Sequence, residues 1–322
     1  MIRFSRKMAC LLAIAISQFH GIAPTWAQEY PSKLIKIVVA NSPGTTQDII
    51  ARSMGPELAK ILGQPIVVEN KVGAQQMVGM EYLAKQVPND GYTLGVASPT
   101  ILAVAPLVVK DLRFDPLKDV PPFIGISSIR LFLLSPAQAP WKNFSEMVAY
   151  AKANPGKLNF GTASPPVRLA METVLRSQGL NLVHIPYKAT APIMLGILAN
   201  EIQLNISAIG DALAPGDRVR LLAVTGDQRY PPLPDVPTFR ELGIQVQGAT
   251  YTLNAPAGTP KSVIDKLYAA STRVLQMPHI QAQFSGMRMD VTGDSPEMAA
   301  KGLAEEARTL SEIAKQIGLR PE

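Results

Sequence analysis

Apolar and polar positions along the first third of the chain follow the order strand, loop, helix. Residues 35–40 form a short apolar run suited to a strand buried on both faces, and apolar positions then recur at helical spacing over residues 49–62. Two further apolar runs lie at residues 65–70 and 92–97, and a segment with apolar positions at helical spacing lies between them at residues 79–86. This succession of strands and helices predicts a parallel sheet with right-handed crossovers.

A polar loop at residues 41–47 joins the first predicted strand to the first predicted helix. The first N–H groups of a helix lack internal partners and the helix dipole adds partial positive charge, so this loop is a ready anion site. The loop at residues 98–100 should share the same rim, because ligands of such sheets sit beyond the carboxyl ends of the strands. The alternative is an ordinary strand-to-helix connection without a ligand.

The second half of the chain repeats this plan between two long extended segments, residues 123–135 and 247–255. Between them, a strand at residues 158–162 runs into a polar loop and a helix at residues 167–178. We interpret the layout as an α/β protein of two lobes joined by two crossover strands, with a cleft between the lobes. The N-termini of the two loop-connected helices could point into that cleft from opposite lobes.

This layout divides the chain into consecutive parts. The predicted division is a signal peptide at residues 1–27, the first part of lobe 1 at 28–127, lobe 2 at 128–249, and a return to lobe 1 at 250–322. Predicted helices at residues 263–275 and 298–316 should pack back on the first lobe. We expect the lobes to close about the crossovers near residues 126–132 and 248–254.

The N-terminus has the features of a secretory signal, which predicts an exported protein. A basic start is followed by an apolar run at residues 8–16 and by small residues that place the cleavage after Ala27. The apolar run is too short to span a membrane, and Cys10 stands at its start rather than at its end, unlike a lipoprotein cysteine. Cleavage leaves 28 basic and 25 acidic residues, a net charge of +3, and removes the only cysteine.

Several classes of chemistry are disfavoured by this composition. No basic stripe with interleaved aromatic residues indicates nucleic-acid binding. His184 and His279 are the only histidines after the signal and lack metal-ligand spacing, so neither a metal nor another cofactor is expected. Asp48 and Asp211 could act as acids or bases, but we expect Asp48 to orient the first helix and Asp211 to hold a loop. His184 is expected to be a hydrogen-bonded structural residue, and the pattern favours binding over enzymatic catalysis.

Short motifs spread along the whole mature chain resemble a known family. They are Tyr30-Pro31-Ser32-Lys33, Ser42-Pro43-Gly44 with Asp48, Leu62-Gly63-Gln64-Pro65, Val68-Glu69-Asn70, Asp90-Gly91-Tyr92-Thr93-Leu94, Ala153-Asn154-Pro155-Gly156-Lys157-Leu158-Asn159, Pro186-Tyr187-Lys188, Leu222-Ala223-Val224-Thr225, Leu233-Pro234-Asp235-Val236-Pro237-Thr238 and Ala255-Pro256-Ala257-Gly258-Thr259-Pro260. With these motifs the chain resembles the periplasmic substrate-binding proteins of tripartite tricarboxylate transporters, the Bug family.

The resemblance implies a type II periplasmic-binding-protein fold that closes on a small organic carboxylate and delivers it to a membrane permease. A monomer is expected, and the alternative is a protein that acts on a sensor or another partner rather than in transport. The residues expected to bind the ligand are Asn41, Ser42, Gly44, Thr45, Thr46, Gln47, Ser98 and Thr100 in lobe 1, and Thr162, Ala163, Ser164, Arg168 and Ser207 in lobe 2.

The departures from the family pattern fall in these loops. Thr45-Thr46-Gln47 and Gln75-Gln76 stand where the family usually has glycines, and Ser207 replaces a common acidic residue. In the second lobe, Pro165-Pro166 removes two backbone N–H donors. A carboxylate held on that side would then need another donor, and the Arg168 guanidinium suits it. The alternative is that Arg168 is a solvated surface residue.

Overall fold

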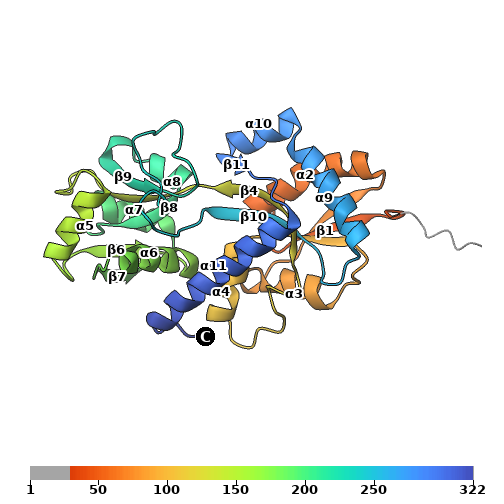
Figure 1. The fold of residues 1–322 in the computed structure, drawn as a ribbon, viewed down its shortest axis with the longest axis horizontal. Helices are drawn as coiled ribbons and strands as arrows, with labels where there is room; N and C mark the ends of the chain where they lie inside the picture. The colour runs from red at the N-terminus through yellow and green to blue at the C-terminus, as the bar shows by residue number, and fades with distance from the viewer. Residues whose placement is uncertain (1–29, 322) are drawn as a thin grey trace, which may run out of the picture.

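The structure, a computed structural model, describes residues 30–321. The predicted signal peptide and its cleavage point lie outside the described residues. The described chain forms two α/β lobes side by side, as predicted (Figure 1).

A six-stranded sheet of order β11-β4-β10-β3-β1-β2 forms the centre of lobe 1. Its strands are β1 (Ile35–Val39), β2 (Ile66–Asn70), β3 (Thr93–Ala97), β4 (Pro122–Ile129), β10 (Ala249–Asn254) and β11 (Met289–Val291). The first three strands are parallel, because helices connect them, whereas β10 runs antiparallel to both of its neighbours. The helices are α2 (Thr46–Leu62), η1 (Ala74–Gln76), α3 (Met77–Lys85), α4 (Pro99–Val108), α9 (Lys261–Leu275), α10 (Pro278–Gly286) and α11 (Pro296–Gln316).

Two smaller sheets form the centre of lobe 2. One has the order β8-β5-β9, and the other pairs β6 with β7 in parallel. The strands are β5 (Leu131–Pro136), β6 (Asn159–Thr162), β7 (Val183–Pro186), β8 (Asn205–Ala208) and β9 (Val219–Val224). The helices are α5 (Phe144–Ala153), α6 (Pro165–Ser177), α7 (Thr190–Leu198), α8 (Ile209–Leu213) and η2 (Gly216–Arg218). Phe160 and Leu204 form an isolated parallel bridge between the two sheets.

Each lobe buries its own apolar core. In lobe 1, one cluster packs α2, α9 and α10 against one face of the sheet, and another packs α3, α4 and α11 against the opposite face. The second of these clusters also contains Leu169 of α6, which is fully buried. The long helix α11 therefore contacts lobe 2, as its path along the molecule shows (Figure 1).

The predicted extended segment at residues 123–135 is two strands that belong to different sheets. Strand β4 ends at Ile129 and β5 begins at Leu131, so Arg130 alone stands between the lobes. Its Nε donates to Asp290 Oδ2 of β11 at 2.6 Å, and its Nη1 donates to the Gln228 carbonyl of lobe 2, also at 2.6 Å. Arg130 thus forms hydrogen bonds to both lobes from its position in the crossing.

The return crossing lies directly against the outward one. Gly248 precedes β10, whose first residue Ala249 pairs with Ile129. A Cβ added at Gly248 would lie 2.7 Å from the Ile129 carbonyl oxygen, so only glycine lets the two crossings approach this closely. The predicted lobe boundaries, after residues 127 and 249, lie near these crossings and remain a proposal.

Two local predictions differ from the structure, and some short elements were not predicted. Helix α6 begins at Pro165 rather than at residue 167, because proline is well suited to the first helical turn. Asp211 is exposed in the first turn of α8 and not in a loop. Helices α8 and α10 and strand β11 were not predicted, because their apolar patterns are too short to stand out.

We predict that Gly248→Ala lowers the free energy of unfolding by about 1–3 kcal/mol, because the Ile129 carbonyl must move to admit the methyl group. The matched control is Gly302→Ala within α11, where an added Cβ meets nothing within 4 Å. That change should raise stability by about 0.5–1 kcal/mol, since alanine favours helix. Chemical denaturation of both variants gives the comparison, and equal shifts would contradict the close crossing.

Candidate functional site

A cavity of about 630 Å³ lies between the two lobes. Lobe 1 lines it with residues from the loops after β1 and β3, from α4 and from α11, and lobe 2 lines it mainly with α6. The return segment at residues 245–249 forms a further part of the wall. Of the predicted binding residues, those that line this cavity are Asn41, Thr45, Thr46, Gln47, Ser98, Thr100 and Ser164.

The N-terminus of α2 opens into the cavity with unused hydrogen-bond donors. Thr45 is its N-cap residue, and the Thr45 side chain makes no capping hydrogen bond. Among the described residues, no hydrogen-bond partner is found for the backbone N–H groups of Thr46 and Gln47. The helix dipole adds partial positive charge at this point, so the helix end can hold an anion without a charged side chain.

Asp48 fixes the shape of this helix end. It is buried, and its carboxylate accepts hydrogen bonds from the Gly44 N–H and Asn70 Nδ2, each at 2.9 Å. The Arg52 Nε group donates to the same carboxylate. The bond from Arg52 is the main reason that the pKa of Asp48 falls to about 2. Asp48 therefore stays ionised at neutral pH and ties the polar loop to α2 and to the end of β2.

Three amide side chains form a chain along the lobe 1 wall of the cavity. Asn41 Nδ2 donates to Gln47 Oε1 at 3.2 Å, and Gln47 Nε2 donates to Gln76 Oε1 at 2.8 Å. Gln76 has φ 80°, in the left-handed region that glycine adopts readily. The polypeptide backbone at Gln76 thus has a conformation typical of glycine, while the Gln76 side chain presents an amide to the cavity. Gln76 was not predicted as a site residue, although its departure from the family's glycines was the available signal.

A buried carboxyl group faces the N-terminus of α4. Thr100 Oγ1 donates to Glu306 Oε1 of α11 at 2.7 Å. Glu306 is only 8% exposed, and no hydrogen-bond partner for its Oε2 is found among the described residues. Burial raises the pKa of Glu306 to about 7, and the bond from Thr100 opposes this shift. Glu306 was missed because Glu305-Glu306 in an amphipathic helix indicates a solvated surface.

The lobe 2 wall is mostly apolar. Val167, Ala170 and Thr173 follow one another along a single face of α6, and all three line the cavity. Pro165 and Pro166 occupy the first positions of this helix and carry no N–H. The N-terminus of α6 therefore offers fewer donors to the cavity than the N-terminus of α2.

Six predicted binding residues are not among those that line the cavity. They are Ser42, Gly44, Thr162, Ala163, Arg168 and Ser207. Thr162 Oγ1 lies 2.7 Å from His184 Nε2, and the Ser207 hydroxyl donates to Asn205. The hydrogen-bonded His184 agrees with its predicted structural role. Whether any of the six contacts a ligand stays a prediction.

The Arg168 side chain lies near His184 rather than on the cavity face of α6. The pKa of His184 is lowered first by burial and then by the positive charge of Arg168. Arg168 is half-buried, and its Nε has no hydrogen-bond partner among the described residues. A fully solvated surface position, the alternative considered from the sequence, therefore does not describe this residue.

Within residues 30–321, no helix is both long and apolar enough to cross a membrane. Over the same residues, no group of three or more histidine, cysteine, aspartate or glutamate side chains could hold a metal ion.

We predict that the free energy of unfolding of Glu306→Gln increases relative to that of the native protein as pH rises from 5 to 8. The raised pKa means that the native carboxyl contributes fully below about 4.5 and loses its contribution as pH rises through about 7. The gap should reach roughly 3 kcal/mol at most. Urea denaturation at several pH values measures it.

The control for this experiment is Glu305→Gln, because Glu305 is the exposed neighbour on the same helix. Its stability difference from the native protein should stay nearly flat over the same pH range. A flat profile for Glu306→Gln as well would show that Glu306 is solvated in the folded protein.

Comparisons with known proteins agree with this architecture. The sequence profile of the family described as "Tripartite tricarboxylate transporter family receptor" matches residues 50–319. The Cupriavidus necator "UPF0065 protein in gbd 5'region" is 32% identical over 305 residues, which cover 92% of this chain and 91% of that protein.

Two solved structures are similar over nearly the whole chain. The periplasmic binding protein BugD is 28% identical with a TM-score of 0.66, and the match covers 91% of this chain and 100% of BugD. Rpa4515 of R. palustris, solved with adipate, is 27% identical with a TM-score of 0.69, and the match covers 91% of this chain and 100% of the Rpa4515 chain. The fold is thus that of periplasmic binding proteins, and the chain belongs to the tripartite tricarboxylate transporter receptor family.

Proposed function

We propose that this protein is an extracytoplasmic receptor that captures a small organic carboxylate between its lobes and delivers it to a membrane permease. The observation that carries this proposal is the N-terminus of α2, whose unpartnered N–H groups open into the interlobe cavity. Backbone donors and a helix dipole suit a carboxylate. The family membership and the adipate complex of Rpa4515 support the ligand class.

The proposed mode of binding places the ligand carboxylate at the first turn of α2. The Thr46 and Gln47 N–H groups would donate to it, and the amides of Asn41 and Gln76 would bond any further polar atoms. Asp48 would hold the loop in this geometry but would not touch the ligand, because its oxygens already accept three donors. This arrangement supports capture and release, since no described residue of the cavity is an activated nucleophile.

The remaining predicted residues are proposed to act when the lobes close further. Ser42 and Gly44 lie in the same loop as Thr45, and Thr162 and Ala163 directly precede the N-cap Ser164 of α6. Rotation about the crossings at Arg130 and at the segment before β10 would bring the lobe 2 group toward lobe 1. Ser207 and Arg168 are further candidates on the lobe 2 side.

The proposed location is the periplasm, where the protein would act without a cofactor and as a monomer. The signal-like N-terminus predicted from the sequence supports export, and the similar protein BugD is a periplasmic binding protein. Membership of a transporter receptor family supports delivery to a permease, and action on a sensor is the alternative.

We predict that Thr46→Pro weakens carboxylate binding by roughly tenfold to a hundredfold relative to Thr46→Ala. Thr46 is the first residue of α2, where proline is tolerated, and the extended backbone of Thr45 suits a following proline. Both variants lose the hydroxyl group, but only the proline loses the N–H donor. Calorimetry measures the affinity of each variant for the same ligand, the tightest binder from a thermal-shift screen of mono-, di- and tricarboxylates.

Two outcomes would contradict this function. A screen in which no carboxylate raises the melting temperature would remove the ligand class, because a ligand at ~100 times its dissociation constant adds ~2.7 kcal/mol of stability. Equal affinities of the two Thr46 variants would show that the carboxylate is held elsewhere than at the first turn of α2.

We predict that saturating ligand reduces the radius of gyration, because two close crossings join the lobes and the lobes can rotate about them. Small-angle scattering with and without the ligand measures the change. A radius that stays constant at saturation would indicate a cleft that binds without closure.

A further inference from the structure

The two walls of the interlobe cavity differ in chemistry. On the lobe 1 side, the ends of α2 and α4 meet the cavity with hydroxyl, amide and backbone N–H groups. On the lobe 2 side, the cavity is lined by the side chains of Leu131, Val167 and Ala170. Val246 of the return segment adds to this apolar surface, and the exposed side chains of Gln245 and Gln247 flank it. A ligand that spans the cavity would therefore meet donors at one end and hydrocarbon at the other.

The polar groups on the lobe 2 side do not change this picture. Thr173 lines the cavity, but its hydroxyl donates to the Leu169 carbonyl at 2.8 Å within α6. The two prolines at the start of α6 supply no N–H, and the Arg168 N–H already donates to the Ser164 carbonyl at 3.0 Å. The Ser164 hydroxyl and the Val167 N–H are the remaining donors found at this helix end, and one hydroxyl with one N–H is a weaker site for a carboxylate than the donors at the start of α2.

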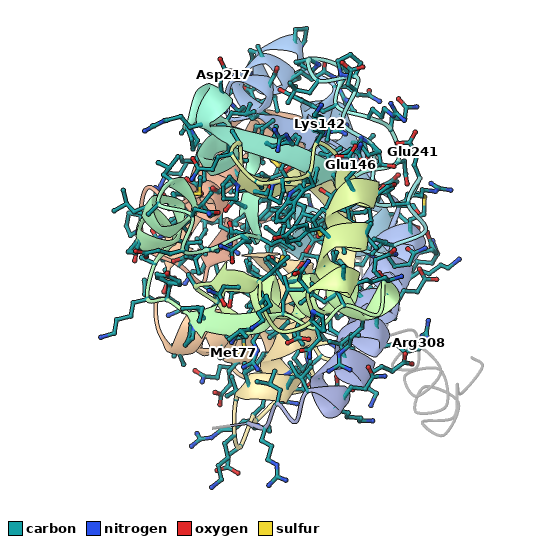
Figure 2. All side chains as sticks on the ribbon, turned by 90° about the vertical axis from the view of Figure 1, so that its left-hand side faces the viewer. Met77, Lys142, Glu146, Asp217, Glu241 and Arg308 are labelled. Atoms are coloured by element: carbon teal, nitrogen blue, oxygen red, sulfur yellow. The ribbon has the colours of Figure 1, made fainter. Side chains whose placement is uncertain are left out.

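The ionisable groups of the cavity wall also disfavour a second carboxylate. Glu305 lies on α11, so a second negative charge beside that helix would approach its carboxylate. Arg308 is the cation among the lining residues, and its Nη1 already pairs with Glu312 Oε1 at 3.1 Å. Its side chain is 70% exposed and lies at the outer side of α11 (Figure 2). Tyr251 is the remaining titratable group of the lining and is neutral at neutral pH, since burial raises its pKa.

We propose that the cleft selects monocarboxylates with an apolar chain or ring over dicarboxylates of the same length. The carboxylate would bind the first turn of α2, and the apolar body would lie against Val167, Ala170 and Leu131. This inference rests on the proposed function and names the class of carboxylate. The physical reason is that an apolar wall gains by burying hydrocarbon, whereas a carboxylate there would lose hydration and find no charged donor among the described lining residues of lobe 2.

The test compares acids of equal length that differ only at the far end. Calorimetry measures hexanoate against adipate and octanoate against suberate on the full mature protein. In each pair, the monocarboxylate should bind at least about tenfold more tightly. Adipate is an informative member of the set, because Rpa4515, a protein of the same fold, was solved with it.

A matched pair of variants tests the wall itself. Val167→Lys places a cation on the cavity face of α6, and it should raise the affinity for adipate relative to hexanoate by about tenfold or more. The control is Leu195→Lys on α7, which also exchanges an aliphatic side chain of lobe 2 for lysine but at a position that is 68% exposed. This control should leave the ratio of the two affinities unchanged.

Each outcome separates this inference from the function on which it rests. Equal affinities within a pair, or tighter binding of the dicarboxylate, would overturn the selectivity while leaving a carboxylate receptor in place. Tighter adipate binding that is lost in Arg308→Ala would assign the second carboxylate to Arg308. A ratio that Val167→Lys leaves unchanged would show that the apolar body does not reach α6. Absence of binding by every acid in the set, and in the wider screen, would overturn the proposed function together with the inference.

Discussion

The approach of the two crossings between the lobes sets the geometry of everything on either side. Strand β4 leaves the lobe 1 sheet at Ile129 and the chain enters the lobe 2 sheet at Leu131, with Arg130 alone between them. The return crossing touches this point through Gly248, which has no side chain to hold the backbones apart. The cavity forms beside these crossings, because Leu131, Gly248 and Ala249 all line it. A change in their angle would therefore move both walls of the site.

Recognition at the lobe 1 wall depends on backbone groups that a buried network holds in place. The N–H groups of α2 carry no net charge, so the protein can bind an anion there without the desolvation cost of a buried cation. Asp48 makes this possible by satisfying Gly44, Asn70 and Arg52 behind the helix end. The Thr46 and Gln47 N–H groups that face the cavity have no partner among the described residues, whereas the three donors behind the helix end are paired with Asp48.

The C-terminal helix α11 contributes the least expected part of the site. It contacts α4 and α6, so it lies against both lobes, and it brings Glu306 to the hydroxyl of Thr100. Burial raises the pKa of this carboxyl group to about 7, so its protonated form, which can donate a hydrogen bond, persists to higher pH than in an exposed glutamate. The Glu305 carboxylate of α11 and the apolar face of α6 both disfavour a second negative charge in the cavity.

The amino-acid sequence alone determined the fold class and the lobe 1 rim. The apolar run at Ile35–Val39 and the polar loop before α2 are local patterns, and the rule that parallel strands end at one edge placed Thr46 and Ser98 together. The tertiary structure decided the rest. Glu306 reaches Thr100 across 206 positions, and the rotation of α6 turns Val167 toward the cavity while Arg168 is not among the lining residues. No local pattern encodes such placements, because they depend on how helices from distant parts of the chain pack against one another.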